Sequence, residues 1–259
     1  MALVRSERRG RAVLLTLARP AERNALSTAL ITELGEQVLA AASDPGVGAL
    51  AITGEGSAFC AGADLKEALD KTRDAEDFRA WLGGWRHVFR TIETLDKPVI
   101  AAVQGLALAG GLELVLACDV VVASDEARFG DAHINYGLVP GGGGSKRLPD
   151  AIGGRAARWL MFTGEMIDAR RAFELGLVQQ VLPAEGFSSA VLDLAAGIAQ
   201  RSPAALAFMK RQTRSPLISD DALDHELEGA VGVVTGSDAR EGLSAFVEKR
   251  SPAFPSLSG

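Results

Sequence analysis

Short apolar runs that alternate with segments of helical periodicity constrain the fold of this sequence more than any other feature. The apolar runs cover residues 12–17, 47–53, 99–103 and 119–123 and predict buried strands. Residues 28–42 and 76–95 carry apolar side chains at helical spacing, and Ser27 suits the cap of the first helix. Strands that alternate with helices are typical of parallel pairing. The pattern therefore predicts an α/β core.

The character of the sequence changes after about Leu148, where strand signals become sparse. Helices are predicted over residues 153–162, 168–175, 186–200, 203–214 and 220–249. We therefore expect the α/β core to be followed by a helical C-terminal region.

The charge and the cysteine content limit the classes of partner. A formal net charge of −6 over 259 residues argues against nucleic acid or an anionic membrane surface as a partner. The two cysteines, Cys60 and Cys118, cannot form a disulfide framework and favour a reducing cytoplasm. The start of the chain lacks an apolar signal core. Residues 99–118 include Gln104, Glu113 and several glycines, so a strand, a loop and a buried helix are expected there instead of a membrane span.

The glycine-rich segments match no common phosphate-binding motif. Residues 141–148, GGGGSKRL, lack the Gly-Lys-Ser/Thr end of a P-loop. The glycines at 46 and 48 precede a strand, whereas a dinucleotide fingerprint follows one. No GxSxG elbow is present, and the histidines at 87, 133 and 225 match no zinc spacing. Kinase, nicotinamide dehydrogenase, α/β-hydrolase and metalloenzyme functions are therefore not indicated.

One segment with chemical potential covers residues 59–66, FCAGADLK. Its small residues let a ligand approach the backbone closely, and Asp64 suits the start of a helix. Peptide N–H groups beside such a helix could donate to an anionic oxygen. The alternative is a plain strand-to-helix turn with a capping Asp, which this segment by itself favours.

The second such segment covers residues 104–113, QGLALAGGLE, and continues as an apolar helix that must be buried. Gly110 and Gly111 open this helix, so the first N–H groups lack intrahelical acceptors and lie at the positive end of the dipole. Glu113 follows about one turn later among apolar neighbours, and burial raises the pKa of a carboxyl group into a range that suits an acid or base. Alternatively, Glu113 complements the helix dipole or pairs with an arginine.

These segments, with others along the chain, resemble the crotonase (enoyl-CoA hydratase/isomerase) superfamily. The matching stretches are RPxxxNAL from Arg19, FCAGADLKE, KPVIAAVQGLALAGGLEL, RFGDAHINYGLVPGGGGSKRLP, TGEMIDARRAFELGLVQQVLP and REGLSAFVEKRSPAF. The resemblance implies a spiral of ββα units over residues 1–195 and a helical trimerisation region over residues 196–259. It also implies an acyl-CoA thioester substrate and a homotrimer or homohexamer.

The resemblance further implies the positions of the site residues. The backbone N–H groups of Ala63 and Gly110 would form an oxyanion hole for a thioester enolate, which preorganised donors stabilise by several kcal/mol. Gly141 would help to hold the catalytic water. The substrate-binding set would comprise Arg23, which would approach the CoA phosphates, with Ala25, Ala61, Asp64 and Leu65.

The sequence departs from the family pattern at one catalytic position. Hydratases of this family use two glutamates around the added water; Glu113 matches the first, and His133 stands where the second would be. His133 could replace that glutamate as acid or base, could be a binding residue, or could be structural.

The leading function is therefore hydration of a trans-2-enoyl-CoA. Isomerisation, hydrolysis or decarboxylation of another acyl-CoA is the alternative, and a non-catalytic acyl-CoA binder is a third possibility. No metal or redox cofactor is indicated, and CoA is expected to arrive as part of the substrate. Trp81, Trp85 and Phe89 lie at helical spacing and are interpreted as packing residues or walls of an acyl pocket, and Cys60 as a small buried residue.

Overall fold

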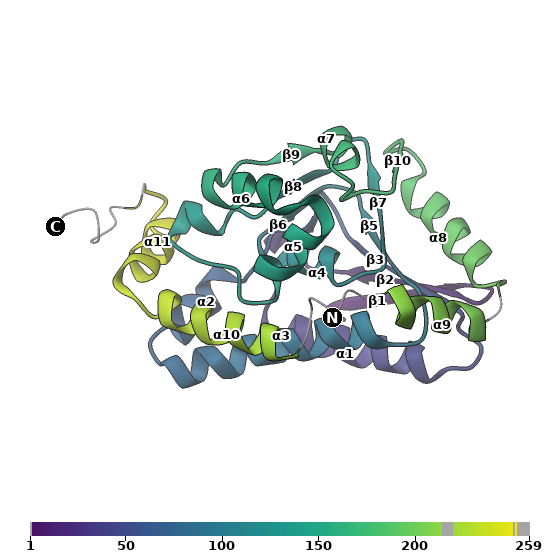
Figure 1. Ribbon diagram of the computed structural model, residues 1–259, viewed down its shortest axis with the longest axis horizontal. Coiled ribbons are helices and arrows are strands. Elements are labelled where there is room, and N and C mark those ends of the chain that lie inside the picture. The colour runs from purple at the N-terminus through teal and green to yellow at the C-terminus, as the bar shows by residue number, and fades with distance from the viewer. Residues whose placement is uncertain (1, 202, 214–219, 251, 253–259) are drawn as a thin grey trace.

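The protein consists of two β-sheets with helices packed around them (Figure 1). The computed structural model describes residues 2–201, 203–213, 220–250 and 252. Helix α1 (Thr28–Ser43) packs on strands β1 and β2 and on α3 (Ala75–Thr94), and α8 (Phe187–Ile198) packs on β2 and β3. In Figure 1, α1 and α3 run along the bottom of the molecule and α8 lies on the right.

The larger sheet has six strands, and most of its neighbours are parallel. Its strands, in spatial order, are β1 (Val4–Arg9), β2 (Ala12–Leu17), β3 (Ala49–Gly54), β5 (Val99–Val103), β7 (Val120–Ser124) and β10 (Gln180–Leu182). Only the β1–β2 hairpin at the edge is antiparallel, and the other four pairings are parallel. The prediction of an α/β core with parallel strands is therefore confirmed.

The smaller sheet contains the second strand of three successive strand pairs, together with β9. Its order is β4 (Ala58–Cys60), β6 (Leu106–Leu108), β8 (Arg128–Gly130) and β9 (Ile167–Asp168), and only the last pair is antiparallel. Thus β3–β4, β5–β6 and β7–β8 each place one strand in each sheet before the chain enters a helical segment. The remaining helical elements are η1 (Pro20–Glu22), α2 (Leu65–Lys71), α4 (Gly110–Leu116), η2 (His133–Tyr136), α5 (Gly144–Ile152), α6 (Gly154–Thr163), α7 (Ala169–Glu174), α9 (Pro203–Thr213), α10 (Asp220–Val234) and α11 (Ser237–Val247).

Strand β2 shows how the core covers both faces of the larger sheet. Leu15 and Leu17 are buried in the cluster that includes α1 and α3, whereas Leu14 is buried in the cluster that includes α8. Successive side chains of a strand point to opposite faces, so burial of both faces gives a run that is apolar except for the half-buried Thr16. Burial of each such side chain contributes about 1.5–3 kcal/mol.

Several strands were not predicted, for identifiable reasons. Strands β4, β6, β8, β9 and β10 have two or three residues, too few to establish an alternating pattern. Strand β1 is an edge strand with mostly exposed polar residues, so its sequence carries no buried face. The predicted strand at residues 47–53 begins two residues later, at Ala49.

The helices follow the predicted ranges with one break. Residues 220–249 form two helices, because the chain is extended at Gly236, which caps α11 (ψ 172°). Ser27 and Asp64 cap α1 and α2 as predicted, each accepting a hydrogen bond from a backbone N–H group. The predicted end of α9 at Arg214 lies outside the described residues.

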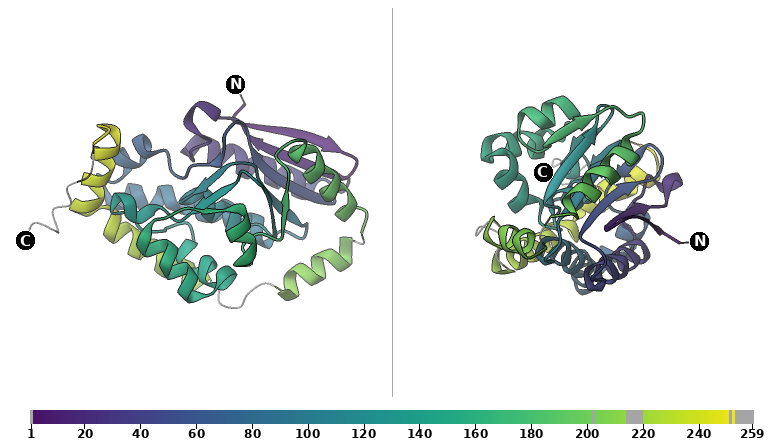
Figure 2. Two further views of the ribbon diagram at one scale, coloured as in Figure 1. Left: turned by 90° about the horizontal axis from the view of Figure 1, so that it is seen from above. Right: turned by 90° about the vertical axis from the view of Figure 1, so that its right-hand side faces the viewer.

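The C-terminal helices fold back onto the core of the same chain. Helix α10 packs on α3, and α11 packs on α2 and η2. Figure 2 places α8 and α9 at one end of the molecule and α11 at the other. Lys210 of α9 forms an ion pair of 2.7 Å with Asp119, which anchors α9 beside the start of β7. The boundary between residues 195 and 196 stays a prediction.

Candidate active site

The loop after β2 is fixed by a buried amide side chain. Asn24 is fully buried; its Oδ1 accepts from the Arg19 N–H at 2.9 Å, and its Nδ2 donates to the Ala58 carbonyl at 2.7 Å. Arg23 and Asn24 both adopt left-handed backbone conformations, with φ of 51° and 56°. Non-glycine residues in this region are strained and are held by their surroundings. The loop is therefore tied rigidly to β4.

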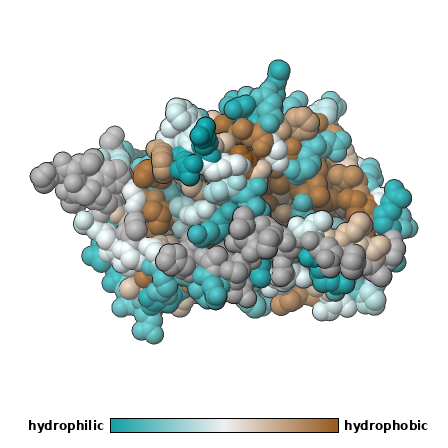
Figure 3. Space-filling view, in the orientation of Figure 1, coloured by the Kyte–Doolittle hydropathy of each residue, from teal (hydrophilic) through white to brown (hydrophobic). Residues whose placement is uncertain are grey.

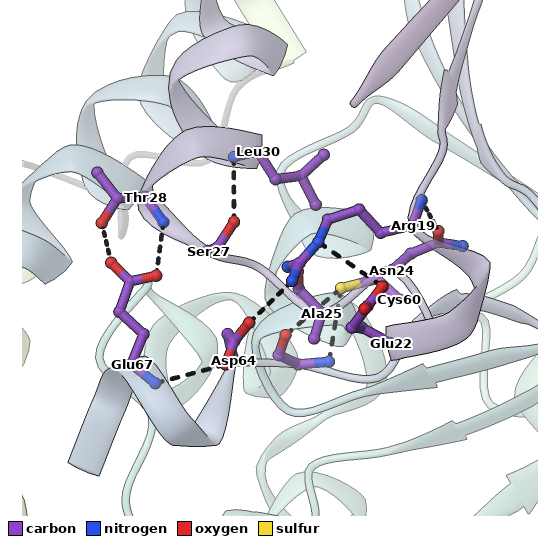
Figure 4. A network of polar contacts seen from close by, with 11 residues as sticks. Arg19, Glu22, Asn24, Ala25, Ser27, Thr28, Leu30, Cys60, Asp64 and Glu67 are labelled. Carbon is purple, nitrogen blue, oxygen red and sulfur yellow. Dashed lines mark hydrogen bonds and ion pairs between the residues drawn. The ribbon is translucent and has the colours of Figure 1, made fainter. Parts of the chain in front are cut away.

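Arg19 joins this loop to the start of α2 (Figure 4). Its guanidinium donates to the Ala25 carbonyl at 2.6 Å and to Asp64 Oδ2 at 3.0 Å. The Asp64 carboxylate also caps α2 by accepting from the Glu67 N–H group. The predicted role of Asp64 in substrate binding stays a prediction, and its observed contacts are to protein.

The other predicted binding residues lie along the same edge. The Ala61 N–H donates to the Arg23 carbonyl at 3.0 Å, and the Arg23 side chain is exposed. Leu65 is the first residue of α2, and Ala25, Ala61 and Leu65 are all half-buried. The structure thus brings the predicted binding residues of the two segments together, and their contact with CoA stays a prediction.

The Ala63 N–H group points away from the strand-like contact that holds its backbone. Leu26 and Ala63 form a parallel bridge in which Leu26 bonds only to the flanking residues, with Leu26 N to Gly62 O at 2.7 Å and Asp64 N to Leu26 O at 3.0 Å. In such a bridge the N–H and C=O of Ala63 face the opposite side. The Ala63 N–H therefore faces away from Leu26.

The close packing of Gly62 brings the face of the Ala63 backbone that is opposite Leu26 against the start of α4. Gly62 has φ of 103°, and a Cβ atom there would lie 3.0 Å from the Ala109 Cβ and 3.4 Å from the Gly110 nitrogen. At Gly111 a Cβ atom would lie 2.1 Å from the Cys60 carbonyl oxygen. Glycines at these positions therefore allow β4 and α4 to meet closely enough for the Ala63 and Gly110 N–H groups to be neighbours.

Helix α4 begins with a strained residue. Ala109 has φ of 48° and ψ of −119°, and its N–H donates to the Gly130 carbonyl at 3.0 Å. Gly110 is the first helical residue, so its N–H has no acceptor within the helix. Within the described part of the chain, no protein hydrogen bond engages the N–H of Ala63 or of Gly110. This is the arrangement of donors expected of an oxyanion hole.

Glu113 lies one turn into α4 and is held by backbone donors. Its side chain is buried, and Oε1 accepts from the Gly142 and Gly144 N–H groups, both at 2.8 Å. Burial raises the pKa of the Glu113 carboxyl; His133 and the two N–H groups oppose this effect, and the Asp131 charge adds to it. Glu113 is thus a fixed, buried carboxyl group of the kind suited to accept a proton.

An ion pair supports the loop that holds Glu113. Arg147 is buried, donates to the Gly142 carbonyl at 2.8 Å, and pairs with both carboxylate oxygens of Glu93 at 3.1 Å. Burial disfavours ionisation of Glu93, but the hydrogen bonds and charges of Arg147 and Arg90 outweigh it and lower the pKa of Glu93. Sequence reasoning missed Gly142, Gly144 and this pair; the only signal was an arginine after a glycine run.

Gly141, which the sequence predicts to hold the catalytic water, is buried. A Cβ atom there would lie 2.7 Å from Leu82 Cδ1, and the predicted role of Gly141 stays a prediction.

His133 is the first residue of η2, and its electrostatic effect reaches the Glu113 carboxyl group. Its Nδ1 is 3.1 Å from Asp131 Oδ1, and its charge influences the ionisation of Glu113. The structure therefore brings His133 and Glu113 into one electrostatic cluster, with Asp131 as a third member.

The aromatic residues of α3 form the wall behind these groups. A Cβ atom at Gly110 would lie 2.6 Å from Trp85 Cζ3, and one at Gly142 would lie 3.0 Å from Phe89 Cε2. Trp85 and Phe89 thus pack against the two glycines on either side of Glu113. Burial raises the pKa of the Cys60 thiol to about 12, which agrees with its interpretation as an inert buried residue.

Known proteins resemble this chain over nearly its whole length. The enoyl-CoA hydratase/isomerase family model matches residues 7–256. The 2,3-dehydroadipyl-CoA hydratase of Escherichia coli (strain K12) is 40% identical over 250 residues, which cover 95% of this chain and 96% of that protein. The crystal structure of carnitinyl-CoA hydratase from Mycobacterium avium matches with a TM-score of 0.86 at 35% identity and covers 99% of both chains.

An enoyl-CoA hydratase from Mycobacterium avium subsp. paratuberculosis K-10 matches with a TM-score of 0.86 at 31% identity, covering 98% of both chains. The predicted crotonase-like fold is thereby confirmed over nearly the whole length. The chain belongs to the enoyl-CoA hydratase/isomerase family.

Proposed function

We propose that this protein hydrates trans-2-enoyl-CoA thioesters to 3-hydroxyacyl-CoA products through a thioester enolate. The observation that carries the proposal is the position of Glu113, one helical turn from Gly110, whose N–H group and that of Ala63 lack a protein acceptor within the described residues. Addition of water to the β-carbon moves negative charge onto the thioester oxygen. Donors already aimed at that oxygen lower the barrier, and loss of one such donor costs about 10²–10³ in kcat.

The proton transfers require one group at the water and one at the α-carbon. Glu113 accepts a proton from water as the water oxygen bonds to the β-carbon. His133 delivers a proton to the α-carbon and later recovers one from Glu113 through solvent. Both groups suit this task because burial raises the pKa of the Glu113 carboxyl and because an imidazole ordinarily titrates near neutrality.

The names of the relatives support water addition. Each of the three proteins compared above is named as a hydratase. CoA enters as part of the substrate, and no separate cofactor is proposed. Arg23, Ala25, Ala61, Asp64, Leu65 and Gly141 are proposed to line the CoA and water positions.

We also propose that the protein assembles as a homotrimer or homohexamer in the cytoplasm. Exposed apolar side chains of α6, α7 and the chain beside them support assembly, because isolated monomers rarely expose so many large apolar groups together. They are Trp159, Phe162, Met166 and Phe173, each more than half exposed. Apolar residues gather in the upper part and on the right of the face drawn in Figure 3. Light scattering on a size-exclusion column tests the assembly, and a monomeric mass would contradict it.

The proposed compartment rests on the cysteines. The two free thiols fit a reducing compartment. Among the described residues, no helix is long and apolar enough to cross a bilayer.

The activity is tested directly with purified protein. Incubation with crotonyl-CoA and with a longer trans-2-enoyl-CoA should remove the absorbance of the conjugated thioester, and Glu113→Gln should abolish this loss. Unchanged absorbance despite measurable acyl-CoA binding would reject hydration and favour isomerase, hydrolase or decarboxylase substrates.

A further inference from the structure

Asp131 and His133 are placed side by side by the backbone between them. Ala132 has φ of 57°, a left-handed conformation, and Asp131 Oδ1 lies 3.1 Å from His133 Nδ1. The side chain of Asp131 is 3% exposed and that of His133 is 11% exposed. Asp131 directly follows Gly130, whose carbonyl accepts from Ala109 N. Asp131 is therefore the residue next to the one that holds the start of α4, where the proposed oxyanion donors are.

The turn that carries His133 is held by other contacts. Its backbone bonds run from Leu138 N to His133 O and from Gly137 N to Ile134 O, both at 3.1 Å. The Asn135 side chain donates to the Gly164 carbonyl at 3.0 Å and ties the turn to the end of α6. These contacts hold the backbone of the turn independently of Asp131. The Asp131 carboxylate contacts the imidazole ring itself, so its effect is on the orientation of the ring.

A carboxylate at Nδ1 selects one tautomer of a neutral imidazole. The Nδ1–H donates to the carboxylate, so the lone pair lies on Nε2 and the ring cannot rotate without losing the hydrogen bond. Nε2 is then the atom that gains and loses a proton.

We propose that Asp131 is the positioning residue for His133 and holds the imidazole with Nε2 directed to the α-carbon of the acyl-CoA. This inference rests on the proposed hydration. Water adds its oxygen to the β-carbon and its proton passes to Glu113. At the same time His133, which starts as the imidazolium with a proton on each nitrogen, passes its Nε2 proton to the α-carbon and becomes the neutral Nδ1–H form. The reset moves the proton from Glu113 to His133 Nε2 through solvent, so the cycle consumes one water and leaves both groups as they began.

A double-mutant cycle tests this role. Asp131→Asn should lower kcat by roughly 10²-fold with little change in KM, because the amide can donate to Nδ1 and stabilise the wrong tautomer. In a His133→Gln background the same substitution should change kcat by no more than about twofold, since no imidazole remains to be oriented. Equal losses of kcat in both backgrounds would show that Asp131 only stabilises the local structure, and would overturn the proposal. Asn135→Ala is the matched control in the same turn; it should lower the melting temperature, and its effect on kcat should be the same in both backgrounds.

Exchange of the α-proton separates this proposal from the proposed function. In D₂O the wild-type protein should exchange the α-protons of butyryl-CoA, which has no double bond to hydrate. Glu113→Gln should retain the exchange, whereas His133→Gln and Asp131→Asn should lose it. Hydration by wild type with full activity in Asp131→Asn would reject the positioning role alone. Exchange that depends on Asp131 and His133 without hydration would reject hydration alone.

The ring tautomer gives a readout that needs no turnover. Nitrogen-15 NMR of the wild-type protein, with the His133 signals assigned by their loss in His133→Gln, should show the Nδ1–H form when the ring is neutral. An Nε2–H form would overturn the proposal even if Asp131→Asn failed to fold.

Discussion

Glu113 and His133 belong to the same cluster, but they are held in place by different means. Glu113 is fixed by backbone N–H groups of Gly142 and Gly144, and the loop that supplies them is fixed in turn by the buried Arg147. His133 lies on a short turn, and its side chain contacts the carboxylate of Asp131. The two backbone donors to Glu113 are glycines because a Cβ atom would lie 2.8 Å from the carboxylate at Gly142 and 3.1 Å at Gly144, whereas a site made from side chains allows one residue to be exchanged for another. This difference would allow an imidazole to stand at the proposed catalytic position without a change in the fold.

The largest effect is expected from substitution of Glu113 itself. Glu113→Gln should lower kcat by about 10²–10⁴-fold, because the amide cannot accept the proton from water. The amide oxygen can still accept from Gly142 and Gly144, so the melting temperature should stay the same or rise. Initial rates and thermal unfolding of both proteins check this, and a large loss of stability would show that the charge of Glu113 serves the fold.

The ion pair between Arg147 and Glu93, which supports the loop that binds Glu113, can be removed without changing a residue that contacts Glu113. Glu93→Ala should lower the free energy of unfolding by about 3–5 kcal/mol, because Arg147 would remain buried without its carboxylate partner. Urea unfolding at neutral pH measures the loss. Glu228→Ala provides the matched control: this carboxylate pairs with Arg79 at the surface, where solvent screens the charges, and its removal should leave the free energy of unfolding nearly unchanged.

One added methyl group at Gly142 tests whether the position of the Glu113 carboxylate requires glycine there. A Cβ atom at Gly142 would lie 2.8 Å from Glu113 Oε2 and 3.0 Å from Phe89, so Gly142→Ala should displace the carboxylate and lower kcat/KM by roughly 10²-fold. At the exposed Gly84 of α3 nothing lies within 4 Å of an added Cβ. Gly84→Ala should therefore leave activity unchanged and stabilise the protein by about 0.5–1 kcal/mol. Equal kinetics for the two variants would contradict the role given to Gly142.

The smallest effect is expected in the acidic pH dependence. Burial raises the pKa of Glu113 above 4.5, and the group acts as a base only when ionised. Activity should therefore fall as pH decreases through this raised value, by about tenfold per unit. Because the folded pKa is raised, this group stabilises the protein less as pH rises above 4.5, so Glu113→Gln should gain stability relative to wild type over that range. A limb of kcat/KM at or below pH 4.5 would show that Glu113 is not the base.

Prediction from sequence succeeded where a pattern extends over many residues. The helices α1 and α3 and the long strands β2, β5 and β7 follow from their periodicity, and the caps Ser27 and Asp64 follow from their residue type. The paired strands β4, β6 and β8 did not, because three residues carry no period. These short strands carry the site, since they set the start of α4 against the loop at Gly62.

The sequence by itself determined the α/β class, the family resemblance and the burial of Glu113, because apolar periodicity and the order of glycines are local properties of the chain. Only the tertiary structure decided which groups meet. The Gly142 and Gly144 donors lie 29 and 31 residues from Glu113, and Arg147 lies 54 residues from Glu93. Such pairings depend on how the two sheets and their helices pack, and packing is a property of the whole fold.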